Sequence, residues 1–128
     1  MLYLVATPIG HLADLSQRAL DTLKISDVIL CEDTRTSSIL LHHYKIQKPL
    51  FSYHRWKEKK GLEPILAQLR KEKTVSLLSD AGTPCISDPG WYLIQACIEE
   101  KIPFTAIPGP CSPIQALLLS GFETEPFQ

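Results

Sequence analysis

The order of apolar segments along the chain constrains its fold more than any single motif does. Five short apolar runs, residues 2–6, 27–31, 49–53, 74–78 and 103–107, alternate with segments in which apolar residues recur at helical spacing. Short apolar runs of this kind are typical of buried strands, and the segments between them are typical of amphipathic helices. Strands that alternate with helices form parallel sheets, because each helix crosses back over the sheet. We therefore predict an α/β fold with a mainly parallel five-stranded sheet and helices on both faces.

Two of the expected helices share the same kind of start. Asp88 precedes Pro89, and Ser112 precedes Pro113. A side-chain acceptor followed by proline predicts an N-cap and the first helical residue. Gly121 is the expected end of the last helix. Residues 1–121 are thus expected to form one α/β domain, and residues 122–128 a linker or tail towards a second domain that the chain lacks.

Composition restricts the class of protein. The length of 128 residues, the 45% hydrophobic content and the 21% charged content are ordinary for one soluble globular domain. No apolar run approaches the roughly 20 residues of a membrane helix. The cysteines at positions 31, 85, 97 and 111 form no CxxC pair, which disfavours a zinc site and fits reduced thiols in the cytoplasm. We therefore expect a cytoplasmic protein with no metal site and no membrane association.

Basic residues are concentrated in one stretch, although the net charge of −1 disfavours a nucleic-acid clamp formed by the whole domain. Residues 45–60 contain six lysines and arginines against one acid, together with Tyr53, His54 and Trp56. Two interpretations remain open. The stretch is either a solvated loop and helix start, or a patch where cations contact phosphates and aromatic rings stack on unstacked bases.

The segments that follow the strands carry the residues best suited to chemistry. These segments are residues 7–10, 32–35, 79–90 and 108–112, and each is rich in polar residues, glycine or proline. The carboxyl ends of parallel strands meet at one edge of the sheet, where α/β proteins bind ligands. Residues 79–90 are longer than the usual connection of about two to six residues. Because the sequence has no GxGxxG or GxxxxGK[ST] loop, we expect backbone groups of these loops to surround a small polar ligand of another kind.

The acidic segment Glu32–Arg35 has two open interpretations. It is either a helix N-terminus, where acids are favourable and Arg35 pairs with Glu32 or Asp33, or an acid–base cluster that acts on a substrate.

Taken in order, residues 2–10, 12–16, 32–35, 79–90 and 107–110 resemble the tetrapyrrole methylase superfamily. Within it, they are most similar to the branch that transfers a methyl group from S-adenosylmethionine to the ribose 2′-hydroxyl of a cytidine in 16S rRNA. The resemblance covers nearly the whole chain. It implies two α/β domains with the methyl donor in the cleft between them, a homodimer, and the small ribosomal subunit as partner. The chain resembles the first domain, so alone it is expected to be weakly active or inactive.

The resemblance also implies site residues. Those expected to contact or shape the donor site are Pro8, Ile9, Gly10, Asp80, Gly82, Thr83, Ile86, Cys111 and Ser112. Those expected to contact RNA are Arg35, His54, Arg55 and Lys57. Thr83 stands where the relatives that modify tetrapyrroles carry an aspartate, which favours the RNA branch.

The expected chemistry needs alignment of oxygen, carbon and sulfur, and it benefits from a base, because the 2′-hydroxyl is a weak nucleophile. Glu32 and Asp33 are the candidates for the catalytic base within this chain, and a base from the second domain is an equal alternative. Two other functions remain open: a tetrapyrrole (precorrin) methyltransferase, and a non-catalytic small-ligand-binding or interaction module.

Overall fold

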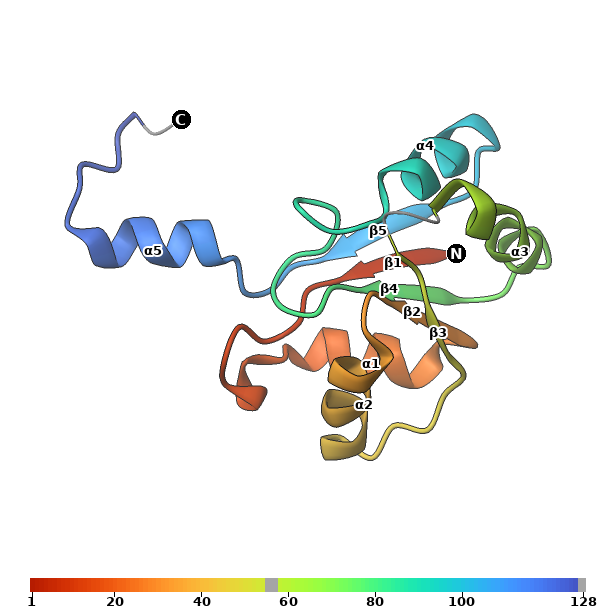
Figure 1. The fold of residues 1–128 in the computed structure, drawn as a ribbon, viewed down its shortest axis with the longest axis horizontal. Helices are drawn as coiled ribbons and strands as arrows, with labels where there is room; N and C mark the ends of the chain where they lie inside the picture. Colours follow the sequence, from red (N-terminus) through yellow and green to blue (C-terminus); the bar gives the residue numbers. More distant parts are fainter. Residues whose placement is uncertain (55–57, 127–128) are drawn as a thin grey trace.

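The fold is a single parallel sheet covered by helices (Figure 1), seen in a computed structural model that describes residues 1–54 and 58–126. Within these residues the strands are β1 (Leu2–Val5), β2 (Val28–Cys31), β3 (Leu50–Ser52), β4 (Val75–Leu78) and β5 (Phe104–Ile107). The five strands lie in the order β3-β2-β4-β1-β5, and every pairing is parallel. The predicted α/β fold is confirmed.

The centre of the sheet is formed by its most apolar strands. β4 is buried along its whole length, since Val75, Ser76 and Leu77 are 0% exposed and Leu78 is 1% exposed. The one polar residue in that strand, Ser76, forms a 2.6 Å hydrogen bond with the buried hydroxyl of Ser26. This bond offsets the cost of burying two hydroxyl groups in an otherwise apolar layer.

Helices cover both faces of the sheet, as predicted. On one face lie α1 (Gln17–Ile25) and α2 (Thr34–His43), and on the other lie α3 (Glu58–Arg70) and α4 (Trp91–Glu99) (Figure 1). Each pair of helices closes its own apolar core against the sheet. The strands therefore have the burial on both faces that their continuous apolar runs indicated.

The segment between β1 and β2 forms a 3-10 turn, η1 (Leu12–Asp14), followed by α1, which is capped by the Ser16 hydroxyl. Two predicted helix starts differ from the observed ones. The predicted cap at Asp88 is wrong, because Gly90, with φ of 139°, is the N-cap and α4 begins one residue later. The predicted cap at Ser112 is also wrong, because Cys111 is the N-cap and Ser112 is already helical.

The last helix, α5 (Ser112–Ser120), lies apart from the sheet (Figure 1). It ends at Gly121, which has φ of 72°, as predicted. The helix contains no charged residue, yet Leu118 is 63% and Leu119 is 87% exposed. A helix of this composition is normally buried. The domain boundary after residue 121 stays a prediction. Among the described residues, no helix is long and apolar enough to cross a membrane.

Candidate functional site

Three loops at the carboxyl edge of the sheet are hydrogen-bonded to one another. The backbone N–H groups of Thr7 and Gly82 each donate to the carbonyl of the other residue, at 2.9 and 3.0 Å. The Thr83 hydroxyl donates to the carbonyl of Pro110 at 3.1 Å, and the Ser79 hydroxyl donates to the Gly82 carbonyl at 2.8 Å. Residues 79–90, here called the long loop, therefore lie between residues 7–10 and residues 108–112 and form hydrogen bonds with both segments.

Gly82 is required for this close approach. Its φ of 77° lies in the left-handed region that favours glycine. A Cβ atom at this position would lie 3.3 Å from Ile9 Cγ2 and 3.5 Å from the Pro110 carbonyl oxygen. This geometry is consistent with the predicted role of Gly82 in shaping the site. The short distance to Ile9 Cγ2 also places Ile9, which lies between Pro8 and Gly10 in the sequence, beside the long loop.

A cavity of about 190 Å³, here called the loop cavity, lies where the long loop meets the start of α5. It is lined by Ala81, Gly82, Thr83, Ile86, Ser87, Asp88, Cys111, Ser112 and Pro113. Five of the residues predicted to contact or shape the donor site are among them, although the two segments are more than twenty residues apart in the sequence. Because ligand pockets usually measure about 300–1,000 Å³, this cavity is suited to hold one part of a larger molecule.

A second cavity of about 450 Å³, here called the polar cavity, is lined by Glu32, Asp33, Thr34, Arg35, Ser52, His54 and Asp80. It brings both candidate bases together with two of the residues predicted to contact RNA. Asp80, which the resemblance grouped with the donor residues, lines this cavity instead. The other two predicted RNA contacts, Arg55 and Lys57, lie outside the described residues, as does Trp56.

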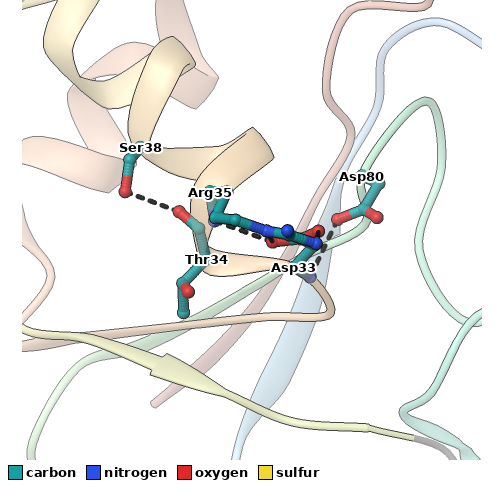
Figure 2. A network of polar contacts seen from close by, with 5 residues as sticks. All are labelled: Asp33, Thr34, Arg35, Ser38 and Asp80. Atoms are coloured by element: carbon teal, nitrogen blue, oxygen red, sulfur yellow. Dashed lines mark hydrogen bonds and ion pairs between the residues drawn. The ribbon is translucent and has the colours of Figure 1, made fainter.

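The Asp33 carboxylate is both a helix cap and an ion-pair partner (Figure 2). Its Oδ1 atom accepts from the Arg35 backbone N–H at 2.8 Å, and its Oδ2 atom accepts from Arg35 Nη2 at 2.8 Å. The backbone N–H of Asp33 donates in turn to Asp80 Oδ1 at 3.0 Å. Hydrogen bonds from Arg35 lower the pKa of Asp33 to about 2. The interpretation of this segment as a helix N-terminus is thus confirmed for Asp33 and Arg35.

Replacing Arg35 by alanine is expected to raise the pKa of Asp33 from about 2 towards its usual value. Because the pKa is lowered in the folded state, the cap contributes stability above the unfolded-state pKa and loses it as the pH falls towards 2. A carboxyl-carbon NMR titration measures the change. Arg18→Ala is the matched control, since the Arg18 guanidinium donates to the Ala106 carbonyl elsewhere on the molecule. An unchanged Asp33 titration in Arg35→Ala would contradict this account.

The Asp88 carboxyl group connects the two cavities. It lines the loop cavity and forms a side-chain hydrogen bond with Glu32, which lines the polar cavity. Burial raises the pKa of Asp88, the charge of Asp80 raises it further, and the bond to Glu32 lowers it. A hydrogen bond between two carboxyl groups needs one proton, which such a pair takes up more readily than a single carboxylate does. The wall between the two cavities is therefore a group that can hold a proton.

The sequence did not indicate this role of Asp88, which was expected to cap a helix. The excess length of residues 79–90 was the only signal available. One of the two interpretations of the basic stretch made Tyr53 an aromatic platform for bases; the ring is instead 3% exposed and packs in the core. Among the residues that the structure describes, no group of three histidine, cysteine, aspartate or glutamate side chains is placed to hold a metal ion.

Known proteins share both the sequence and the fold. The chain is 52% identical over 127 residues to the ribosomal RNA small subunit methyltransferase I of Hydrogenobaculum sp., covering 98% of this chain and 55% of that protein. It is 45% identical to the protein of the same name in Escherichia coli O157:H7, covering 98% of this chain and 44% of that protein. The chain thus spans about half the length of these curated relatives.

The fold is also that of a solved methyltransferase. The crystal structure of uroporphyrin-III-C-methyltransferase from Thermus thermophilus matches with a TM-score of 0.72 at 24% identity, over 95% of this chain and 53% of that one. The family described as tetrapyrrole (corrin/porphyrin) methylases matches residues 1–126, a range that includes all the loops at the carboxyl edge. Since this match runs through nearly the whole sequence, the chain belongs to the tetrapyrrole methylase family.

Proposed function

We propose that this chain supplies the donor-binding half of an S-adenosylmethionine-dependent methyltransferase. Its substrate is the ribose 2′-hydroxyl of a cytidine in 16S rRNA, in the small ribosomal subunit of the cytoplasm. The observation that carries the proposal is the contact between the two cavities through Glu32 and Asp88. One cavity has the residues expected for the donor, and the adjoining one has the candidate bases and the Arg35 guanidinium, which can contact a phosphate. The names of the relatives that are 52% and 45% identical support this choice of substrate.

The loop cavity fits one side of the donor. Ile86 is 73% exposed beside backbone groups of the long loop, so it offers an apolar surface to a nucleoside. Thr83, Cys111 and Ser112 offer polar groups within the same cavity. When bound, S-adenosylmethionine supplies a methyl group that its sulfonium already activates. The chain must therefore hold the ribose oxygen in line with that group and accept the proton that the hydroxyl loses.

Of the two candidate bases, we propose Glu32. Asp33 is held by Arg35 through both carboxylate oxygens, and its pKa of about 2 makes it a weak base at neutral pH. Glu32 bonds instead to Asp88, whose pKa is raised. When both carboxylates are charged, their repulsion favours uptake of one proton, so a proton taken by Glu32 is then shared with Asp88. Asp33 and Arg35 then serve to fix the start of α2, which positions Glu32.

Donor binding is the first test of this assignment. We expect calorimetry to detect weak binding of S-adenosylmethionine to this chain, and Ile86→Glu to reduce it at least tenfold by placing a charge where the nucleoside packs. Ile98→Glu is the matched control, because Ile98 is 54% exposed on α4 and does not line the loop cavity. Tight binding of an unrelated nucleotide without any binding of the donor would refute the proposal.

Methyl transfer is the second test. Residues 1–126 would be joined to the second half of the Hydrogenobaculum relative and assayed with a tritiated methyl donor on small ribosomal subunits and on a precorrin. We expect label in the RNA, in an alkali-resistant dinucleotide, because a 2′-O-methyl group protects the adjoining phosphodiester. Label in the precorrin alone would favour the tetrapyrrole methyltransferase. Donor binding with no transfer to either substrate would favour a non-catalytic module.

A further inference from the structure

A groove of about 520 Å³ lies at one edge of the sheet, between β3 and α3. This β3 groove is lined by residues of β2, β3, α3 and β4 and of the segments beside them, among them Asp27, Pro49, Phe51, Ser52, Gln68 and Lys73. Its volume is within the usual range for small-ligand sites, about 300–1,000 Å³. The groove is distinct from the loop cavity, with which it shares no lining residue.

The groove is open because β3 is an edge strand that α3 does not cover. The strand register places Phe51 beside Leu30, on the face of the sheet that packs against α3 and α4. Leu66 and Leu69 of α3 are buried in that core, whereas Phe51 remains 56% exposed. An aromatic ring on the wall of a groove provides a flat apolar surface, which suits the face of another planar ring.

The remaining lining residues suit the edge of a heterocyclic ring. Gln68 and Lys73 carry side-chain hydrogen-bonding groups around the apolar floor. The Asp27 carboxylate is already engaged, since its Oδ2 atom accepts from the Thr74 backbone N–H at 2.8 Å. Proteins hold the unstacked bases of single-stranded RNA in this way: aromatic side chains stack on the faces of the bases, and polar groups form hydrogen bonds with their edges.

The β3 groove adjoins the polar cavity. Ser52 lines both of them, so the groove begins where the cavity with Glu32 and His54 ends. At its other end, Lys48 directly precedes the lining residue Pro49, and Lys73 lines the groove itself. A strand of RNA that places its reacting ribose in the polar cavity would therefore continue along β3 towards these cations, which can contact its phosphates.

We propose that the β3 groove binds the base of a nucleotide next to the methylated one, stacked on the ring of Phe51. This inference rests on the proposed function, because it takes the ribose in the polar cavity as its starting point. It also makes Phe51 the aromatic platform, a role for which one of the two interpretations of the basic stretch considered Tyr53.

The test is the affinity of this chain for a short single-stranded RNA in which 2-aminopurine replaces the base on either side of the target cytidine. Base–aromatic stacking is worth about 1–3 kcal/mol per base, so Phe51→Ala should raise the Kd roughly 5- to 150-fold and remove the fluorescence quenching at one of the two positions. Phe51→Trp should retain both the affinity for the RNA and the fluorescence quenching. Phe104→Ala is the matched control, since Phe104 is 38% exposed on β5 at the opposite edge of the sheet.

The possible results separate the groove from the proposed function. If Phe51→Ala binds and quenches like Phe104→Ala, or if wild-type protein binds no RNA, the groove does not hold a base. If the joined protein methylates subunits while Phe51→Ala leaves its KM unchanged, the function stands and the groove assignment fails. If RNA binding depends on Phe51 but no methyl group is transferred, the groove stands and the function fails. Thermal unfolding of each variant confirms that it is folded.

Discussion

Replacing Gly90 by alanine is expected to destabilise the folded chain by about 3 kcal/mol or more. This is the largest effect we expect from adding one methyl group to the loops at the carboxyl edge of the sheet. A Cβ atom at this position would lie 2.2 Å from Cys85 Sγ and 2.9 Å from Leu77 Cδ2. Neither neighbour moves easily, because Leu77 is fully buried in β4 and Cys85 Sγ donates a hydrogen bond to the Pro89 carbonyl at 3.6 Å. The φ of 139° at Gly90 adds backbone strain to the clash. Urea unfolding followed by tryptophan fluorescence measures the loss.

Gly10→Ala separates the clash from the backbone strain. Gly10 has a similar φ of 150°, but among the described residues no atom lies within 4 Å of the Cβ position. We expect it to lose only about 1 kcal/mol, the typical cost of strain at such a position. Adding Cys85→Ala to Gly90→Ala should restore part of the stability, because it removes the nearest atom. Equal unfolding midpoints for Gly90→Ala and Gly10→Ala would show that the clash is absent.

Glu32→Gln is expected to slow methyl transfer by roughly 10²- to 10⁴-fold in the joined protein, while the Kd of the donor stays unchanged. Glutamine has nearly the same shape as glutamate, so it keeps the packing of the polar cavity but cannot take the proton of the 2′-hydroxyl. The single-turnover rate with tritiated donor on small ribosomal subunits measures the effect.

Asp33→Asn is the matched comparison for Glu32→Gln. Asparagine still caps a helix, so α2 should begin at the same residue, although the ion pair with Arg35 is lost. We expect a rate within about tenfold of wild type. A Glu32→Gln rate close to wild type would place the base elsewhere, and the second half of the protein would then be the next place to search.

The fold was predictable because it depends on the spacing of apolar residues, which the sequence records directly. The helix starts were less predictable because they depend on backbone angles. Asp88 and Pro89 have the residue types of a cap and a first turn, but the chain bends once more at Gly90 before α4 begins. At Cys111 the helix begins without a side-chain cap, because the hydroxyl of Ser112 is already inside it.

The candidate site was predictable where it follows the strand ends. Ile86 and Cys111 line one cavity because their loops leave β4 and β5 at the same edge of the sheet. The link between Glu32 and Asp88 depends on the path of the long loop, and the β3 groove depends on where α3 leaves the edge strand uncovered. Neither of these is recorded in residue spacing, so both required the structure.

The paired N–H groups of Thr7 and Gly82 have a consequence for the way this edge of the molecule opens. Both residues lie outside the named strands, where amide hydrogens commonly exchange with water through small local fluctuations. Here, exchange of either amide requires the two loops to separate. That separation also breaks the 3.2 Å hydrogen bond that the Thr7 hydroxyl donates to the Ser79 carbonyl. Both amides should therefore exchange at rates similar to those of β1 and β4, as part of the same cooperative unit.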